Sequence, residues 1–127
     1  MVTFYNLHIA TIYSIAGVFN KAEYYFRQAL LLEPEKPDRL NNLSYFLIDK
    51  NRNVNEGLEL IDSALKSNPD NYNYLYIEGW GLYKQGKYKE AVNILQNSWD
   101  LRRQYGEYNH EAYLHLEAAK KAVAGLN

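Results

Sequence analysis

The chain has 127 residues, 47% hydrophobic and 23% charged, and its 14 basic and 15 acidic side chains leave a net charge of −1. This composition is too apolar for a disordered chain and typical of a soluble globular one, and the length suffices for a single core. The near-zero charge argues against nucleic acid or anionic membrane as a partner, and the absence of cysteine excludes disulfides and thiolate sites.

The first element is unusual because residues 1–20 contain no Lys, Arg, Asp or Glu. They lack the cationic start of a signal peptide, and polar residues such as Asn6 interrupt the apolar run that a membrane span needs. The spacing predicts a helix over residues 3–16 that is apolar on more than one face, with Gly17 at its end. A leader or upstream domain missing from the chain is compatible with this segment, and the compartment, cytoplasmic or periplasmic, stays open.

Further along the chain, one pattern occurs three times at spacings of 35 and 34 residues. Each copy has a small residue, a large one four positions later and another small one three positions after that. The copies begin at Ala22, Gly57 and Ala91, continue with Phe26, Ile61 and Leu95, and then with Ala29, Ala64 and Ser98. A second apolar face with small residues precedes each copy. Small side chains at these spacings indicate two helices that cross closely in every copy.

The helices are expected over residues 3–16, 20–33, 37–50, 54–68, 71–85, 88–105 and 108–124, and no strand is expected. Asn20 with Glu23, and Asn53 with Glu56, have the spacing of a capping box at the start of a helix. Pro37 suits a first helical turn, whose N–H groups need no partner within the helix.

This pattern resembles the tetratricopeptide repeat, whose copies of about 34 residues stack into a right-handed superhelix. The stretch GWGLYKQGKYKEA at residues 79–91 is especially similar to bacterial members. The resemblance implies an all-α fold, a right-handed α-solenoid of about three helix pairs at residues 3–36, 37–70 and 71–104, with a C-terminal capping helix at 108–124. These would form a single domain over residues 1–127. The second copy departs from the pattern by one extra residue in its inner turn, at residues 50–53.

In arrays of this family the first helix of each pair lines a concave face. The resemblance therefore implies a protein-protein interaction scaffold whose groove binds a peptide or partner helix. The groove residues carried over are Leu7, Thr11, Asn41, Tyr45, Ile48, Tyr76, Trp80, Tyr83, Lys84, Leu114, Ala118 and Lys121. Rings give rigid apolar area and asparagine can bond a peptide backbone, although the aromatic residues could instead pack between repeats. The cations that would clamp an acidic chaperone tail are missing from these places, so such tails are disfavoured.

The alternative function is structural, because an end repeat with an apolar exterior needs a cover. Either two copies of the chain associate as a homodimer through this repeat, or the chain is a fragment of a longer array. The contact residues would be Phe4, Leu7, Ile12 and Ile15.

No set of residues in the sequence predicts a catalytic, phosphate-binding or metal site. Residues 81–87 read G-x-x-x-x-G-K, but Tyr88 follows where a phosphate-binding loop needs Ser or Thr, so Gly81 is expected inside a helix and Gly86 in a turn. His110 and His115 are five residues apart and lie on different sides of a helix, and with His8 they are interpreted as packed or solvated. We expect no enzyme, no catalytic residue, no cofactor, no metal, no nucleic acid and no membrane insertion.

Overall fold

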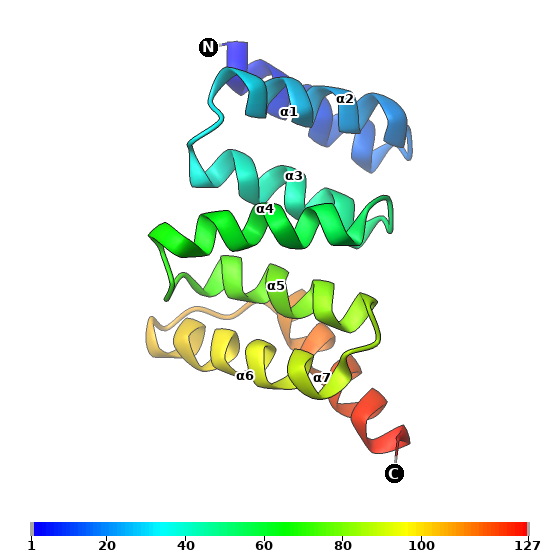
Figure 1. The fold of residues 1–127 in the computed structure, drawn as a ribbon, viewed down its shortest axis with the longest axis vertical. Coiled ribbons are helices and arrows are strands. Elements are labelled where there is room, and N and C mark those ends of the chain that lie inside the picture. The colour runs from blue at the N-terminus through cyan, green and yellow to red at the C-terminus, as the bar shows by residue number, and fades with distance from the viewer. Residues whose placement is uncertain (1, 127) are drawn as a thin grey trace.

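The protein is a stack of seven helices, described by a computed structural model for residues 2–126 (Figure 1). They are α1 (Val2–Ile15), α2 (Phe19–Leu32), α3 (Pro37–Asp49), α4 (Val54–Ser67), α5 (Tyr72–Lys84), α6 (Tyr88–Gln104) and α7 (His110–Gly125). Residues 2–126 contain no strand. Every helix begins and ends within two residues of the expected range, so the all-α prediction is confirmed.

Consecutive helices pack as the pairs α1–α2, α3–α4 and α5–α6, and α7 packs mainly against α6. The small residues lie where the helices of a pair cross. Ala22 and Ala91 have no exposed surface, and a Cβ added to Gly57 would lie 2.6 Å from Cγ1 of Ile48. The Ser44 hydroxyl donates to the carbonyl of Gly57 at 2.9 Å. The predicted close crossings are therefore confirmed.

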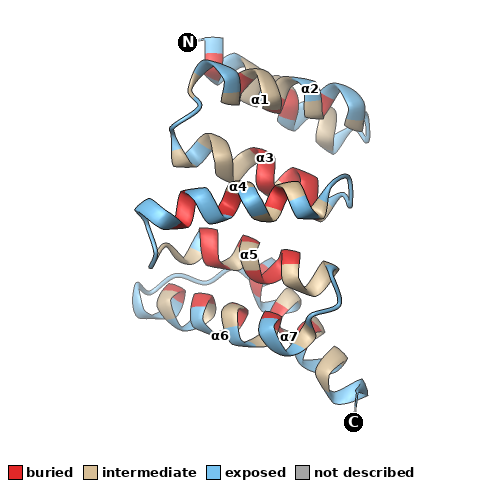
Figure 2. Cartoon of the chain, in the orientation of Figure 1, coloured by how far each residue is buried: buried red, intermediate tan, exposed pale blue. Residues whose placement is uncertain are grey.

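The core runs the length of the stack between successive pairs. Figure 2 shows buried residues on the helix sides that face neighbours and exposed residues on the outside. One cluster joins α1 and α2 to α3 through Phe26, Phe46 and Leu47, and the next joins α3 and α4 to α5. A third cluster, which includes Leu95 and Leu116, joins α6 to α7. Each pair thus buries its apolar face only against its neighbours, as in repeat proteins generally.

The turn and helix-start residues predicted from the sequence lie where they were expected, with one exception. Gly17 and Gly86 have φ values of +79° and +81°, Pro37 is the first residue of α3, and the Asn53 side chain accepts a hydrogen bond from the Glu56 N–H. The capping box predicted at Asn20 is wrong. Since α2 begins one residue earlier, at Phe19, Asn20 lies inside the helix and its side chain points elsewhere.

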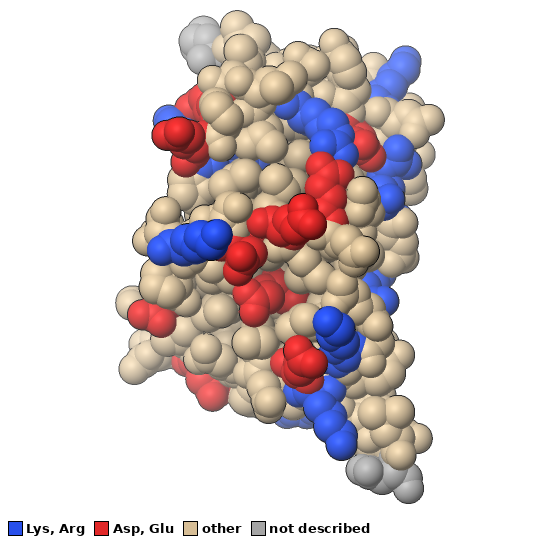
Figure 3. All heavy atoms as spheres, viewed as in Figure 1, with Lys and Arg blue, Asp and Glu red and all other residues tan. Residues whose placement is uncertain are grey.

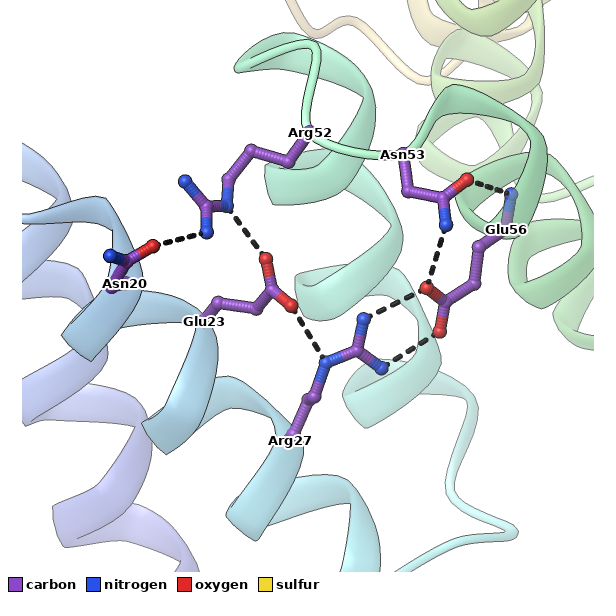
Figure 4. A network of polar contacts seen from close by, with 6 residues as sticks. All are labelled: Asn20, Glu23, Arg27, Arg52, Asn53 and Glu56. Atoms are coloured by element: carbon purple, nitrogen blue, oxygen red, sulfur yellow. Dashed lines mark hydrogen bonds and ion pairs between the residues drawn. The ribbon is translucent and has the colours of Figure 1, made fainter.

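Asn20 instead belongs to an ionic network that joins the first helix pair to the second (Figure 4). Arg27 makes two hydrogen bonds of 2.8 Å to Glu56 and one of 3.0 Å to Glu23. Arg52 bonds Glu23 at 2.6 Å and Asn20 at 2.7 Å. Hydrogen bonds from Arg27 lower the pKa of Glu56 below its usual value despite partial burial. The network matters because the backbones of α1 and α3 stay apart over the described residues, whereas α3 and α5 pack directly.

Candidate functional site

A groove runs along α1, α3 and α5, the first helices of the three pairs, and α7 covers its downstream end. The opposite face is formed by α2, α4 and α6 and carries charges of both signs, with acidic side chains gathered across its middle (Figure 3). Two cavities open in the groove. One of about 400 Å³ lies between α1 and α3, and one of about 280 Å³ lies between α3, α5 and the start of α7.

Asn41 stands where the two cavities meet. Its side chain lines both, as do those of Tyr45 and Glu111. Its Oδ1 atom is buried and has no hydrogen-bond partner within residues 2–126. A buried acceptor left without a donor costs about 1–3 kcal/mol. The groove therefore presents an acceptor that a ligand N–H could satisfy.

The downstream half of the groove is filled by side chains of α7. The His115 ring stacks on Trp80 with centroids 3.6 Å apart and an interplanar angle of 3°. Nδ1 of His115 shares a hydrogen bond with the hydroxyl of Tyr76, and the hydroxyl of Tyr45 donates to the Glu111 carboxylate. Together these contacts hold α7 against both α5 and α3.

Burial sets the ionisation of these groups. It lowers the pKa of His115, an effect that the nearby carboxylates of Glu111 and Asp49 oppose. Burial, and then the hydrogen bond to Glu111, raises the pKa of Tyr45 far above its usual value. The imidazole is therefore held toward its neutral form and the phenol stays protonated.

The predicted groove residues lie in several different environments. Thr11, Asn41 and Tyr45 line open cavities, and Leu7 is half-buried against the first core cluster. Tyr76, Trp80, Tyr83 and Lys84 lie under or beside α7: Trp80 is only 8% exposed, Tyr83 stacks on it, and Lys84 Nζ donates to the Asp49 carbonyl. Trp80 is therefore packed against α7, whereas Tyr76 both contacts His115 and lines the cavity between α3 and α5.

The prediction is wrong for Ile48, which is completely buried in the core between α3 and α5 and offers a ligand no surface. Leu114 and Lys121 are exposed on α7 and Ala118 is half-buried, but the residues of α7 that contact the groove are Glu111 and His115. Neither was predicted as a groove residue, although His115 was expected to be packed or solvated. Their separation of four residues, which places two side chains on one helix face, was the signal that could have found them.

The exterior of α1 is apolar as expected. Phe4, Ile12 and Ile15 are 65%, 53% and 83% exposed, and Ile15 also lines the edge of the cavity between α1 and α3. His8 stacks on Phe4. This surface contains no charged side chain along the whole of α1.

Other sequence features lie where a structural role was expected. Gly81 is inside α5 and Gly86 forms the next turn. His110 is exposed at the start of α7. Over residues 2–126, no three His, Asp or Glu side chains gather as metal ligands would. None of the helices in that part of the chain has both the length and the apolar character of a membrane span.

Comparison with known sequences points to one family. A family model described as tetratricopeptide repeat matches residues 79–105. A TPR repeat-containing protein of Pseudomonas aeruginosa is 38% identical over 90 residues, which cover 71% of this chain and 14% of that protein. Another, from Methanocaldococcus jannaschii, is 29% identical over 126 residues, covering 89% of this chain and 22% of that protein. The chain thus spans less than a quarter of either relative.

Solved structures show the same fold. The Sgt2 TPR domain from Aspergillus fumigatus superposes with a TM-score of 0.81 at 16% identity, covering 98% of this chain and 81% of that one. The first TPR of Spaghetti, solved with an HSP90 peptide, gives 0.76 at 16% identity, with 96% and 93% covered.

The stack of crossed helix pairs defines an α-solenoid, a class in which each repeat contacts only its neighbours. Within that class, the chain belongs to the tetratricopeptide-repeat family.

Proposed function

We propose that the groove binds a peptide segment or a helix of a partner protein and that the chain does no chemistry of its own. The observation that carries the proposal is the buried, unpartnered Oδ1 of Asn41 between two cavities. A peptide backbone supplies N–H donors at regular intervals, which suits this acceptor. Because α7 fills the downstream half, the ligand lies across α1 and α3.

Photo-crosslinking tests where a partner binds. The chain has no cysteine, so Lys50→Cys, at the edge of the cavity between α1 and α3, gives one attachment point for a benzophenone maleimide. Glu59→Cys, exposed on α4 at the edge of a different cavity on the opposite face, is the matched control. We expect adducts with a partner at position 50 and not at 59, identified by mass spectrometry.

A synthetic peptide of the crosslinked segment then tests Asn41. Asn41→Leu should weaken binding about tenfold, which corresponds to about 1.4 kcal/mol, because it removes the acceptor. Asn93→Leu, the same change at an exposed position of α6, should leave the affinity unchanged. Adducts confined to position 59, or equal affinities for the two variants, would refute binding in the groove.

A second proposal concerns the exterior of α1, which we infer to bind a second copy of the chain or a preceding helix pair of a longer array. The three exposed residues of α1 are of two kinds when each is compared with the residue at the corresponding position of α3. Ile12 corresponds to Phe46, which is buried against the preceding pair. Phe4 and Ile15 correspond to Asp38 and Asp49, which are polar. A preceding pair therefore explains exposed Ile12 alone.

Self-association accounts for all three exposed residues. The α1 surface is uncharged, so two copies can approach without like-charge repulsion, and antiparallel packing about a twofold axis would bring Phe4 of each copy near Ile15 of the other. Sedimentation velocity over a range of concentrations should show a dimer. Ile12→Asp with Ile15→Asp should give a monomer, whereas Leu31→Lys, at an exposed leucine of α2, should not. A wild-type monomer at every concentration rules out the dimer.

A further inference from the structure

The groove has two intervals, the first between α1 and α3 and the second between α3 and α5. The cavity in the first interval exists because this interval lacks side chains that the second interval has. Thr11 and Ser14 of α1 occupy the positions that Tyr45 and Ile48 occupy in α3. In the same way, Asn41 of α3 corresponds to Tyr76 of α5. Three small or short side chains thus stand where the next interval has two tyrosines and an isoleucine.

The second interval shows what fills such a space. The rings of Tyr45 and Tyr76 lie 6.1 Å apart between α3 and α5, and the imidazole of His115 stacks on Tyr76 from α7 with centroids 5.5 Å apart. This filling is aromatic, with polar atoms at the ring edges. In the first interval the space stays open at about 400 Å³, within the range of small ligand sites.

Part of the wall of this cavity is apolar and suits an uncharged, bulky side chain, while the rest is polar, with Thr11, Ser14 and Asn42 among the lining residues. Phe26 and Phe46, at 9% and 3% exposure, are among its lining residues, and so is Ile15. The charged groups beside it are already engaged: Asp49 pairs with Lys50 at 3.4 Å, and Glu111 accepts the hydrogen bond of Tyr45. An aromatic ring buries about 150–250 Å² and gains further from contact with other rings.

We propose that this cavity is an anchor site for one aromatic side chain of the bound segment, whose adjacent backbone N–H donates to Oδ1 of Asn41. The inference rests on the proposed groove function and specifies the chemistry of its ligand. The partner segment contributes the ring that Tyr45 and Tyr76 contribute to the next interval. Ligand selection then depends on a single bulky residue, and the acidic tail expected of a carboxylate clamp has no role in it.

Small probes test the anchor site on the whole chain. N-acetyl-L-tryptophanamide and N-acetyl-L-alaninamide are titrated while backbone amide resonances are followed by NMR. The tryptophan probe should cause saturable shifts at Thr11, Asn41 and Phe46, and the alanine probe should not. The tryptophan methyl ester, which lacks the terminal amide N–H, tests the contribution of that donor and should bind more weakly than the amide.

A filled variant provides the specific control. Thr11→Tyr with Ser14→Ile introduces the residues that α3 already has at the corresponding positions, so the fold should tolerate them. The probe shifts should disappear in this variant, and the thermal unfolding midpoint should stay the same or rise. Asn93→Tyr, on the exposed side of α6, should leave the shifts intact.

The outcomes separate this inference from the groove proposal. A crosslinked partner segment that binds the filled variant as tightly as wild type overturns the anchor site and leaves groove binding intact. So does the absence of saturable shifts at Thr11, Asn41 and Phe46 while the segment still binds. Probe binding at these residues, lost together with at least tenfold of segment affinity in the filled variant, supports the anchor site.

Discussion

His115 of α7 contacts two aromatic residues of α5. It stacks on Trp80 and hydrogen-bonds Tyr76 through Nδ1. Because burial lowers its pKa, the folded protein binds this proton less readily than the unfolded chain does. The imidazole therefore contributes stability that is complete above its ordinary pKa of about 6.5 and declines as the pH falls below it.

Thermal unfolding between pH 7.5 and pH 5 should show this dependence. Wild type should lose stability over that window, and His115→Phe, which keeps a stacking ring but does not titrate, should lose less. Glu111, Asp49 and Lys84 are the charged groups that face the imidazole, and all remain in the variant. Parallel pH profiles for the two proteins would contradict the role assigned to His115.

Gly57 shows how closely two helices of a pair approach. A Cβ there would meet Cγ1 of Ile48 at 2.6 Å and the Ser44 carbonyl oxygen at 3.0 Å. Gly57→Ala should therefore destabilise the protein by about 1–3 kcal/mol in denaturant unfolding, because the added methyl overpacks the crossing. At Gly125, near the end of α7, a Cβ would meet nothing within 4 Å. Gly125→Ala should be neutral or stabilising by up to about 1 kcal/mol, and equal losses at both sites would refute the argument.

At the scale of elements, α2 is tied to α4 mainly through Arg27. Its guanidinium bonds Glu23 and Glu56 at once, so removing it leaves two carboxylates close together. Because the Arg27 side chain is 38% exposed, solvent screening weakens its ion pairs. Arg27→Met should therefore lower the free energy of unfolding by about 1–2 kcal/mol. The cost should shrink in 1 M salt. Lys120→Met, which breaks only an exposed pair with Glu117, should have little effect at either salt concentration.

The helices could be predicted from the sequence because each carries its own apolar period and breakers, as Gly17 and Pro37 show. Contacts between distant elements could not. Asn20 and Glu23 have capping-box spacing, but Arg52 and Arg27 bind them instead. The repeat likewise predicted that Thr11, Asn41 and Tyr45 lie on one face, where they line cavities, but not that Ile48 is buried. The filling of the groove by His115 depended on how α7 crosses α5, which no local pattern specifies.

At the scale of the whole molecule, a stack of repeats is held together by the contacts between neighbouring helix pairs. The first pair joins the rest mainly through α2, whose side chains pack on α3 and bond the start of α4. By contrast, α1 rests on α2 and leaves a cavity toward α3. The open end of the groove thus lies beside a helix whose backbone packs on α2 and not on α3, so binding there and order in α1 should be coupled.

Hydrogen exchange measures this coupling directly. Backbone amides of α1 should exchange faster than those of α3 and α5, because fewer buried contacts oppose the local opening of α1. Thr11→Tyr with Ser14→Ile should slow exchange in α1 by bridging it to α3, and a bound partner segment should do the same in wild type. Exchange in α6, away from this cavity, serves as the internal control. If α1 is already as protected as α3, or if filling the cavity slows both α1 and α6 alike, the cavity does not govern order at this end of the stack.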